Sequence, residues 1–250
     1  MDKQEILGKL KYFSKKFPRE ALLAVRENKE EFVEILLKSL EYVNLNAEYL
    51  VHHEKDYFLH TYAMFLLAEF KEKRAFPLLV SMLHFDEEIS RSLLGDDYSD
   101  SYRKILTSTF QDGQIQLLKD VIENPENYDW SRYTAICTLR GLYLEGYLSR
   151  DELISYLREL IYTKLTPDAP FEVSMGIMSC IKDAGLHEML PDVLFLYDND
   201  RVDTMWYGNY DGFVDSVFRK SKQKEPNTID DAIKAMEWWA CFESDEHKFR

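Results

Sequence analysis

The sequence has few cysteines, which cross-link small domains, and few glycines and prolines, which form turns. It contains three cysteines, nine glycines and seven prolines in 250 residues. Cys137, Cys180 and Cys241 lie far apart and form no Cys-x-x-Cys pair, so neither a disulfide framework nor a zinc knuckle is predicted. The low glycine and proline content argues against an all-β protein, which would need many turns. A reducing compartment fits this cysteine usage best.

Long apolar runs and excess positive charge are also missing. No run approaches the roughly 20 apolar residues needed to span a bilayer, and residues 1–5 lack the apolar core of a signal peptide. We therefore expect a cytoplasmic protein that does not bind membranes. Lys and Arg number 31 against 45 Asp and Glu, a formal net charge of −14. Because such a surface repels phosphate, we expect no nucleic-acid partner, whereas a basic partner is electrostatically easier.

What the chain does have is apolar residues at helical spacing. Hydrophobic residues make up 46% of it, which is ample for a core. Six segments carry apolar residues at offsets of 0, 3, 4 and 7 or close to it, the pattern of one buried helical face. These segments, the second-type helices, start at Phe32, Phe76, Ile115, Leu153, Leu190 and Ile229. Successive starts are roughly 40 residues apart, the period of a two-helix HEAT or armadillo unit.

Apolar partner segments, the first-type helices, lie upstream, the clearest at 59–70 and 173–181. The sequence therefore predicts an all-α fold, an α-α superhelix or solenoid of about six helix pairs, because such pairs bury their apolar faces by stacking. We expect a single domain over residues 1–250, with a C-terminal capping helix at about 228–242. Residues 86–97 predict an extra short helix, and the long link 198–211 is a candidate binding loop.

Local signals support this division into helices. Ser149 followed three residues later by Glu152 is a capping box, and Pro191 fits the first turn of a helix. Asp129 or Ser131 is expected to cap the helix that follows it.

Residues 60–75 read HTYAMFLLAEFKEKRA, a run that is typical of one protein family. Shorter family motifs follow in the order expected for that family, at Gly95-Asp96 and at residues 103–106, 122–125 and 150–152. With this pattern, the stretch at about 57–164 resembles a bacterial family of uncharacterised proteins, domain-of-unknown-function family 1186. The resemblance implies an α-solenoid fold and no assigned activity. Some relatives end in a cysteine-rich zinc motif, but Cys241 is followed here by Phe-Glu-Ser-Asp-Glu-His, so that zinc site is not carried over.

Two His-Glu pairs, His53-Glu54 and His187-Glu188, could in principle ligate a metal. Enzymes resembling deoxyhypusine hydroxylase hold two irons with such pairs on HEAT-like repeats. They need four pairs at matching repeat positions, however, and the two pairs here are out of register. We therefore expect no metal and no cofactor, and these histidines read as ordinary surface residues.

Asp56 and His60 are four residues apart, so on one helix they would face the same way and could orient a general base. The alternative is a local hydrogen bond at a helix start. Arg74, Arg103 and Arg132 could hold a phosphate or carboxylate, or simply pair with the many acids. A groove near His60 and Arg74 is thus the basis for an alternative function, a small-molecule enzyme or ligand-binding protein.

The leading function is a non-catalytic scaffold that binds a protein or peptide, since solenoids present extended faces. Offsets of 5 and 9 from the second-type helix starts lie off the buried face. They give a candidate binding surface of Asp120, Arg158, Tyr162, Phe195 and Lys234. The alternative is that Tyr162 and Phe195 pack between repeats.

The C-terminal aromatics also allow two interpretations. Trp238, Trp239 and Phe242 could form an exposed patch for a partner, or they could cover the end of the solenoid.

Overall fold

The structure is a computed structural model that describes residues 1–95, 98–166, 169–219 and 226–242. Within these residues the fold is all-α, as predicted, and the one extended pairing is an isolated bridge between Tyr12 and Tyr57. The α-helices are α1 Lys3–Leu10, α2 Arg19–Glu27, α3 Lys29–His53, α4 Leu59–Glu69, α5 Ala75–Met82, α6 Glu87–Leu94, α7 Tyr98–Thr109, α8 Ile115–Glu123, α9 Asp129–Leu144, α10 Arg150–Glu159, α11 Phe171–Asp183, α12 Leu190–Asp198, α13 Thr204–Tyr207, α14 Tyr210–Phe218 and α15 Ala232–Met236. A π-helical turn, η1 Leu160–Lys164, continues α10, and a 3-10 turn, η2 His187–Met189, precedes α12.

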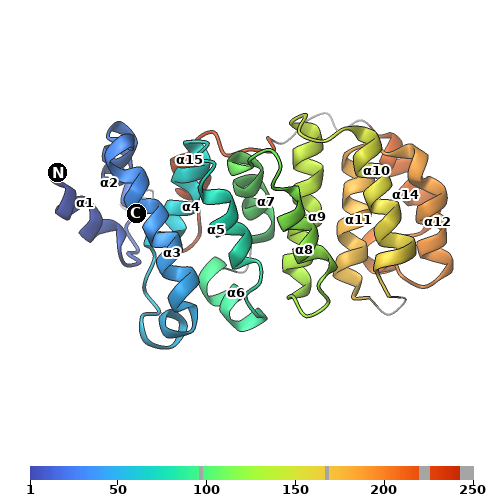
Figure 1. Cartoon of the computed structure of the whole chain (residues 1–250), viewed down its shortest axis with the longest axis horizontal. Coiled ribbons are helices and arrows are strands. Elements are labelled where there is room, and N and C mark those ends of the chain that lie inside the picture. The colour runs from blue at the N-terminus through green and yellow to red at the C-terminus, as the bar shows by residue number, and fades with distance from the viewer. Residues whose placement is uncertain (96–97, 167–168, 220–225, 243–250) are drawn as a thin grey trace, which may run out of the picture.

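The helices follow one another along the long axis of the molecule (Figure 1). The first-type helices α4, α7, α9, α11 and α14 pack on one another in chain order. The second-type helices α3, α5, α8, α10 and α12 each begin within four residues of the predicted start or at it. The hydrophobic core is continuous, because apolar side chains of both helix types face each other from Ile6 to Phe242.

Helix ends follow the local signals with one exception. Ser149 and Glu152 form the predicted capping box, and Pro191 lies in the first turn of α12. The predicted extra helix is α6, which Asp86 caps by accepting a hydrogen bond from the Ile89 N–H at 2.9 Å. The prediction that Asp129 or Ser131 caps α9 is wrong, because α9 begins at Asp129 after an extended Tyr128.

The sixth second-type helix does not lie where the repeat predicts it. Instead of a helix over 228–242 that covers α12 and α14, the short α15 packs on α4 in the N-terminal half (Figure 1). The chain returns along the first-type helices, where the Ile229 N–H donates to Ser108 Oγ at 2.8 Å and the Ala232 N–H donates to Glu69 Oε2 at 2.7 Å. Arg26 pairs with both Glu69 and Asp231 beneath this segment.

The C-terminal aromatic side chains have different surroundings. Trp239 packs edge-on against Phe65 of α4. Phe242 contacts Phe13 and Phe17 of the N-terminal segment, and Trp238 is 70% exposed. These rings therefore cover the N-terminal half rather than the end of the helix stack.

Candidate binding face on the second-type helices

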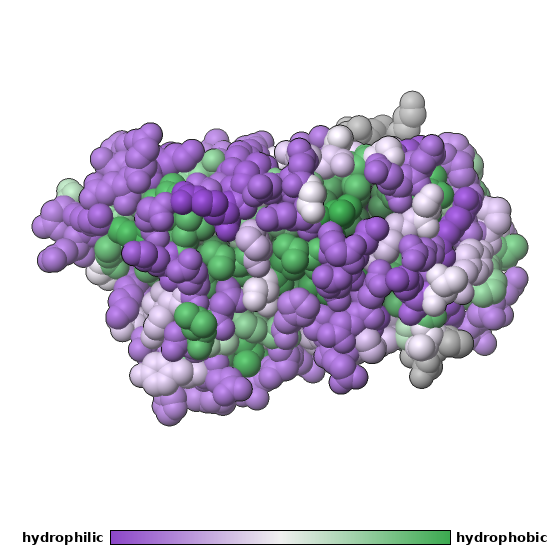
Figure 2. Space-filling view, in the orientation of Figure 1, coloured by the Kyte–Doolittle hydropathy of each residue, from purple (hydrophilic) through white to green (hydrophobic). Residues whose placement is uncertain are grey.

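Helices α8, α10 with η1, and α12 lie next to one another and present the candidate binding face. Polar side chains connect them directly. Tyr156 of α10 donates a hydrogen bond to Glu123 of α8 at 3.1 Å, and Arg150 of α10 pairs with Glu188 of η2 at 2.7 Å. In the space-filling view, apolar and polar side chains alternate over the surface of this part of the molecule (Figure 2).

Three of the five predicted surface residues meet at the junction of α10, η1 and α12. The rings of Tyr162 and Phe195 lie 5.0 Å apart between centroids, tilted by 51°. Arg158 Nε donates to Asp192 Oδ2 at 3.1 Å, and Tyr162 Oη donates to Asp192 Oδ1 at 2.9 Å. We call Arg158, Tyr162, Asp192 and Phe195 the aromatic cluster.

Asp192 holds two side chains of the aromatic cluster in place by hydrogen bonds. Its carboxylate is buried in the first turn of α12, where the positive end of the helix dipole favours a negative charge. Each of its two oxygens accepts a hydrogen bond from a different side chain of α10 or η1. The pKa of the Tyr162 hydroxyl is raised by partial burial and by the hydrogen bond to Asp192, so this tyrosine stays a donor. Sequence reasoning missed Asp192, because an acid inside an apolar segment reads as a solvent-facing residue.

The cluster remains accessible. Tyr162 is 50% exposed, Phe195 is 36% exposed and the Arg158 side chain is 46% exposed. The two rings therefore pack on each other between repeats, as one of the two alternatives predicts, and they also face solvent; that they bind a partner stays a prediction.

The other two predicted surface residues lie apart from the cluster. Asp120 is exposed on α8 and accepts a hydrogen bond from Gln116 Nε2 at 2.8 Å, one helical turn away. Lys234 belongs to α15, whose side chains lie over α4, so its assignment to this face is wrong. The register of the repeat placed it with Phe195, but the chain leaves the repeat after α14.

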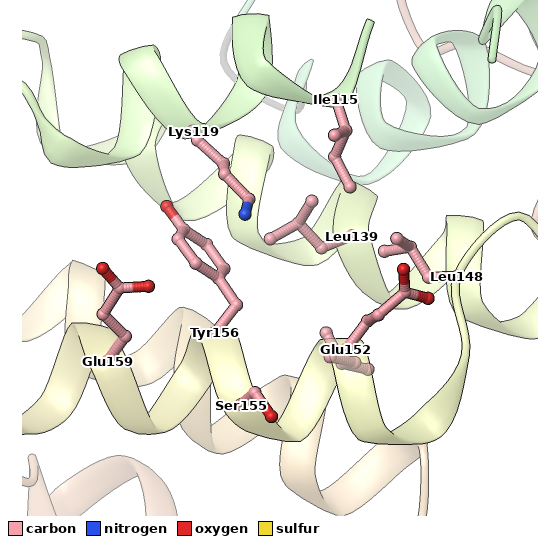
Figure 3. Close-up of a pocket in the computed structure, with 9 residues that line it drawn as sticks. Ile115, Lys119, Leu139, Leu148, Glu152, Ser155, Tyr156 and Glu159 are labelled. Carbon is pink, nitrogen blue, oxygen red and sulfur yellow. The ribbon is translucent and has the colours of Figure 1, made fainter. Parts of the chain in front are cut away.

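A pocket opens between α8 and α10, next to the aromatic cluster, with a volume of about 280 Å³ (Figure 3). Leu139 of α9 and Leu153 of α10 form its buried floor, and Ile115 and Leu148 form half-buried walls. Lys119, Glu152, Ser155, Tyr156 and Glu159 supply its polar rim. No local pattern in the sequence predicts this pocket, because its residues come from three helices and one loop.

The alternative site near His60 is not assembled. His60 is 2% exposed, lies 2.7 Å from the Leu93 carbonyl oxygen through Nε2, and stacks on Tyr57. Burial lowers its pKa to about 4, which keeps the imidazole neutral. Asp56 is exposed before the start of α4, and Arg74 pairs on the surface with Glu34 and Glu72. The prediction that Asp56, His60 and Arg74 share a pocket is therefore wrong.

Arg103, Arg132 and two of the three cysteines are buried inside the protein, whereas Cys241 is exposed. Arg103 pairs with Asp100, and Arg132 donates from Nε to the Ile122 carbonyl at 2.9 Å, so they form no ladder with Arg74. Cys137 and Cys180 are buried, and burial raises the pKa of both thiols. Both thiols therefore stay protonated at neutral pH, which makes them poor nucleophiles.

Metal-ligand clusters and membrane-spanning helices are both absent from the residues that the structure describes. No group of three or more His, Cys, Asp or Glu side chains in them is arranged to hold a metal ion. Among the helices of these same residues, none is both long enough and apolar enough to cross a membrane.

Comparisons with known proteins identify the family of this chain and two similar bacterial proteins. The sequence profile of the family described as "Protein of unknown function (DUF1186)" matches residues 1–243, and the chain belongs to this family. An uncharacterized protein of Chlamydia trachomatis serovar D is 32% identical over 171 residues, which cover 68% of this chain and 67% of the relative. An uncharacterized protein of Chlamydia muridarum is 32% identical over 165 residues, 66% of this chain and 65% of the relative. No solved structure matches the chain.

Proposed function

We propose that this protein is a non-catalytic α-solenoid scaffold that binds a protein or peptide partner at the aromatic cluster. Its helices stack in chain order and so offer a long, continuous face, as repeat proteins use for binding. The family description and the uncharacterized relatives leave the partner open, so the proposal rests on the geometry of the face.

One observation carries the proposal: the half-exposed ring of Tyr162, which packs against the exposed ring of Phe195, is held in place by the buried carboxylate of Asp192. Tyrosine and arginine are enriched where binding energy concentrates at protein interfaces. Because Asp192 fixes both Tyr162 and Arg158 before any partner arrives, binding costs little side-chain entropy. An apolar side chain of the partner would pack on the rings.

The test removes the Phe195 ring and leaves the hydrogen bonds of Asp192 to Tyr162 and Arg158 intact. Phe195→Ala should reduce recovery of the native partner about tenfold in a quantitative pull-down, the effect of a modest interface hot spot. Phe218→Ala is a matched control, because Phe218 is also exposed but lies on α14. Thermal unfolding of both variants should stay close to that of the unsubstituted protein. Unchanged recovery with Phe195→Ala would overturn the proposal, and a large loss of stability would show that Phe195 is a core residue.

A further inference from the structure

The pocket between α8 and α10 contains a cation with no carboxylate partner. The Lys119 ammonium lies 4.3 Å above the centre of the Tyr156 ring, and its nitrogen points into the pocket (Figure 3). Among the described residues, no Asp or Glu oxygen lies within 4.0 Å of it, although the chain has a net charge of −14. The face of a ring stabilises an ammonium but leaves its other N–H groups free to donate.

The two carboxylates of the pocket are in different states. Glu159 is within 3.5 Å of the Lys164 ammonium, so its charge is already compensated. Glu152 uses Oε2 for the capping box, accepting from the Ser149 N–H at 2.8 Å and from Ser149 Oγ at 2.6 Å. Its Oε1 has no hydrogen-bond partner in the described part of the chain, and its carboxylate lies beside Leu148 at one side of the pocket (Figure 3).

The pocket therefore offers one free ammonium and one free carboxylate oxygen above an apolar floor. The hydrogen bonds from Ser149 lower the pKa of Glu152, and the nearby Lys119 charge adds to this effect, so the Glu152 carboxylate stays ionised at neutral pH. They do not form an ion pair with each other. A ligand with both charges could bind between them and complete the hydrogen bonding of each.

We propose that this pocket binds a small zwitterion with an aliphatic side chain, an α-amino acid of about the size of leucine. The ligand carboxylate would accept hydrogen bonds from Lys119, and its ammonium would donate to Glu152. Its side chain would lie on Leu139, Leu148 and Leu153, which give an aliphatic lining. The volume of about 280 Å³ is slightly below that of ligand pockets for drug-sized molecules, which run from about 300 to 1,000 Å³, and this favours a ligand as small as a single amino acid. This site is separate from the aromatic cluster and goes beyond the proposed scaffold function.

Calorimetric titration of the full chain with three matched probes tests the zwitterion requirement. The probes are leucine, 4-methylpentanoate, which lacks the ammonium, and 3-methylbutylamine, which lacks the carboxylate. Leucine should bind, and each single-charge analogue should bind at least about tenfold more weakly, because each leaves one pocket charge unpaired. Equal binding of all three would show hydrophobic capture alone and would overturn the inference, as would no heat from leucine at millimolar concentration.

Two variants locate the binding in this pocket. Lys119→Met should weaken leucine binding about tenfold or more and leave 3-methylbutylamine unaffected. Glu152→Gln should weaken leucine binding in the same way, and glutamine can still serve in the capping box, so the fold should be kept. Lys29→Met is the matched control, because the Lys29 ammonium also lies over an aromatic ring, that of Phe70, but belongs to α3 and does not line the pocket. Leucine binding that survives Lys119→Met would place the amino acid elsewhere and refute the site. The pull-down with Phe195→Ala tests the scaffold function and does not depend on leucine binding. The scaffold proposal and the amino-acid proposal can therefore fail independently.

Discussion

At position 60, a buried histidine is held neutral inside the N-terminal half of the molecule. The short contact from Nε2 to the Leu93 carbonyl fixes the proton on that nitrogen, and Nδ1 is buried without a partner. The folded-state pKa is about 4, against an ordinary value of 6.5. Between these two values the unfolded chain binds a proton at this residue and the folded chain does not. Stability should therefore fall as the pH is lowered through this window, by about 3 kcal/mol at pH 4 from this residue.

Denaturant unfolding at a series of pH values between 7 and 4 measures this effect. His60→Gln should lower stability at pH 7, because a buried contact changes, but it should remove most of the residue's contribution to the pH slope. His52→Gln is the control, since His52 is exposed at the end of α3, and it should keep the slope of the unsubstituted protein. An unchanged slope in His60→Gln would show that His60 does not carry the pH dependence.

Single residues also show where sequence reasoning succeeds. Offsets within helices place Arg158, Tyr162 and Phe195 on one surface, and the three lie together in the structure because α10, η1 and α12 keep that register. Asp56 and His60 have the same type of spacing, but α4 begins at Leu59. The rule that residues four apart share a face applies only inside a helix, so it does not hold for this pair.

Between elements, the approach of α9 and α11 depends on a glycine. A Cβ atom added at Gly176 would lie 3.2 Å from Ile136 Cβ and 3.3 Å from Ile136 Cδ1, with both helices already in contact. Gly176→Leu should therefore destabilise the protein by about 1–3 kcal/mol or more, because the extra side chain cannot enter a closely packed interface. Thermal or denaturant unfolding measures the loss.

Gly8→Leu is the matched control for this prediction. Gly8 lies in the exposed part of α1, and a Cβ atom added there would meet nothing within 4 Å. Leucine is a better helix former than glycine, so stability should stay equal or rise slightly. Equal losses at both positions would mean that the closeness of α9 and α11 does not determine the effect.

The positions of the helices could be predicted well, because periodicity and capping are local. The starts of α8 and α12 coincide with predicted positions, and the capping box at Ser149 forms as expected. The partner of a helix is harder to predict, since an apolar stripe does not specify which surface covers it. The segment from Ile229 fits the repeat in spacing, yet it packs on α4 because Arg26, Glu69 and Ser108 there bind its backbone and its acids.

On the scale of the whole molecule, the last described segment, residues 226–242, packs against the N-terminal half of the chain. Two acids of this segment form ion pairs with the N-terminal half: Glu237 pairs with Arg19, and Asp230 pairs with Lys71. The same packing explains why Lys234 is not part of the predicted binding surface: it belongs to α15, which packs on α4. Non-local returns of this kind leave no periodic signal in a sequence, whereas neighbouring repeats do.

This return predicts which part of the protein depends on its C-terminus. Phe242 is 7% exposed and contacts the rings of Phe13, Phe17 and Phe58, so Phe242→Ala should cost about 3–5 kcal/mol of local stability. Hydrogen exchange should accelerate in α1, α2 and α4 and stay unchanged in α11, α12 and α14, since helices in such a stack are stabilised mainly by their neighbours. Trp238→Ala, at a mostly exposed ring four residues earlier, should leave exchange unchanged throughout. If Phe242 instead covered the C-terminal end of the stack, the result would be the opposite: exchange would become faster in α12 and α14 and stay unchanged in α4. The location of the change thus separates the two arrangements, because each places the same aromatic side chain on a different end of the row of helices.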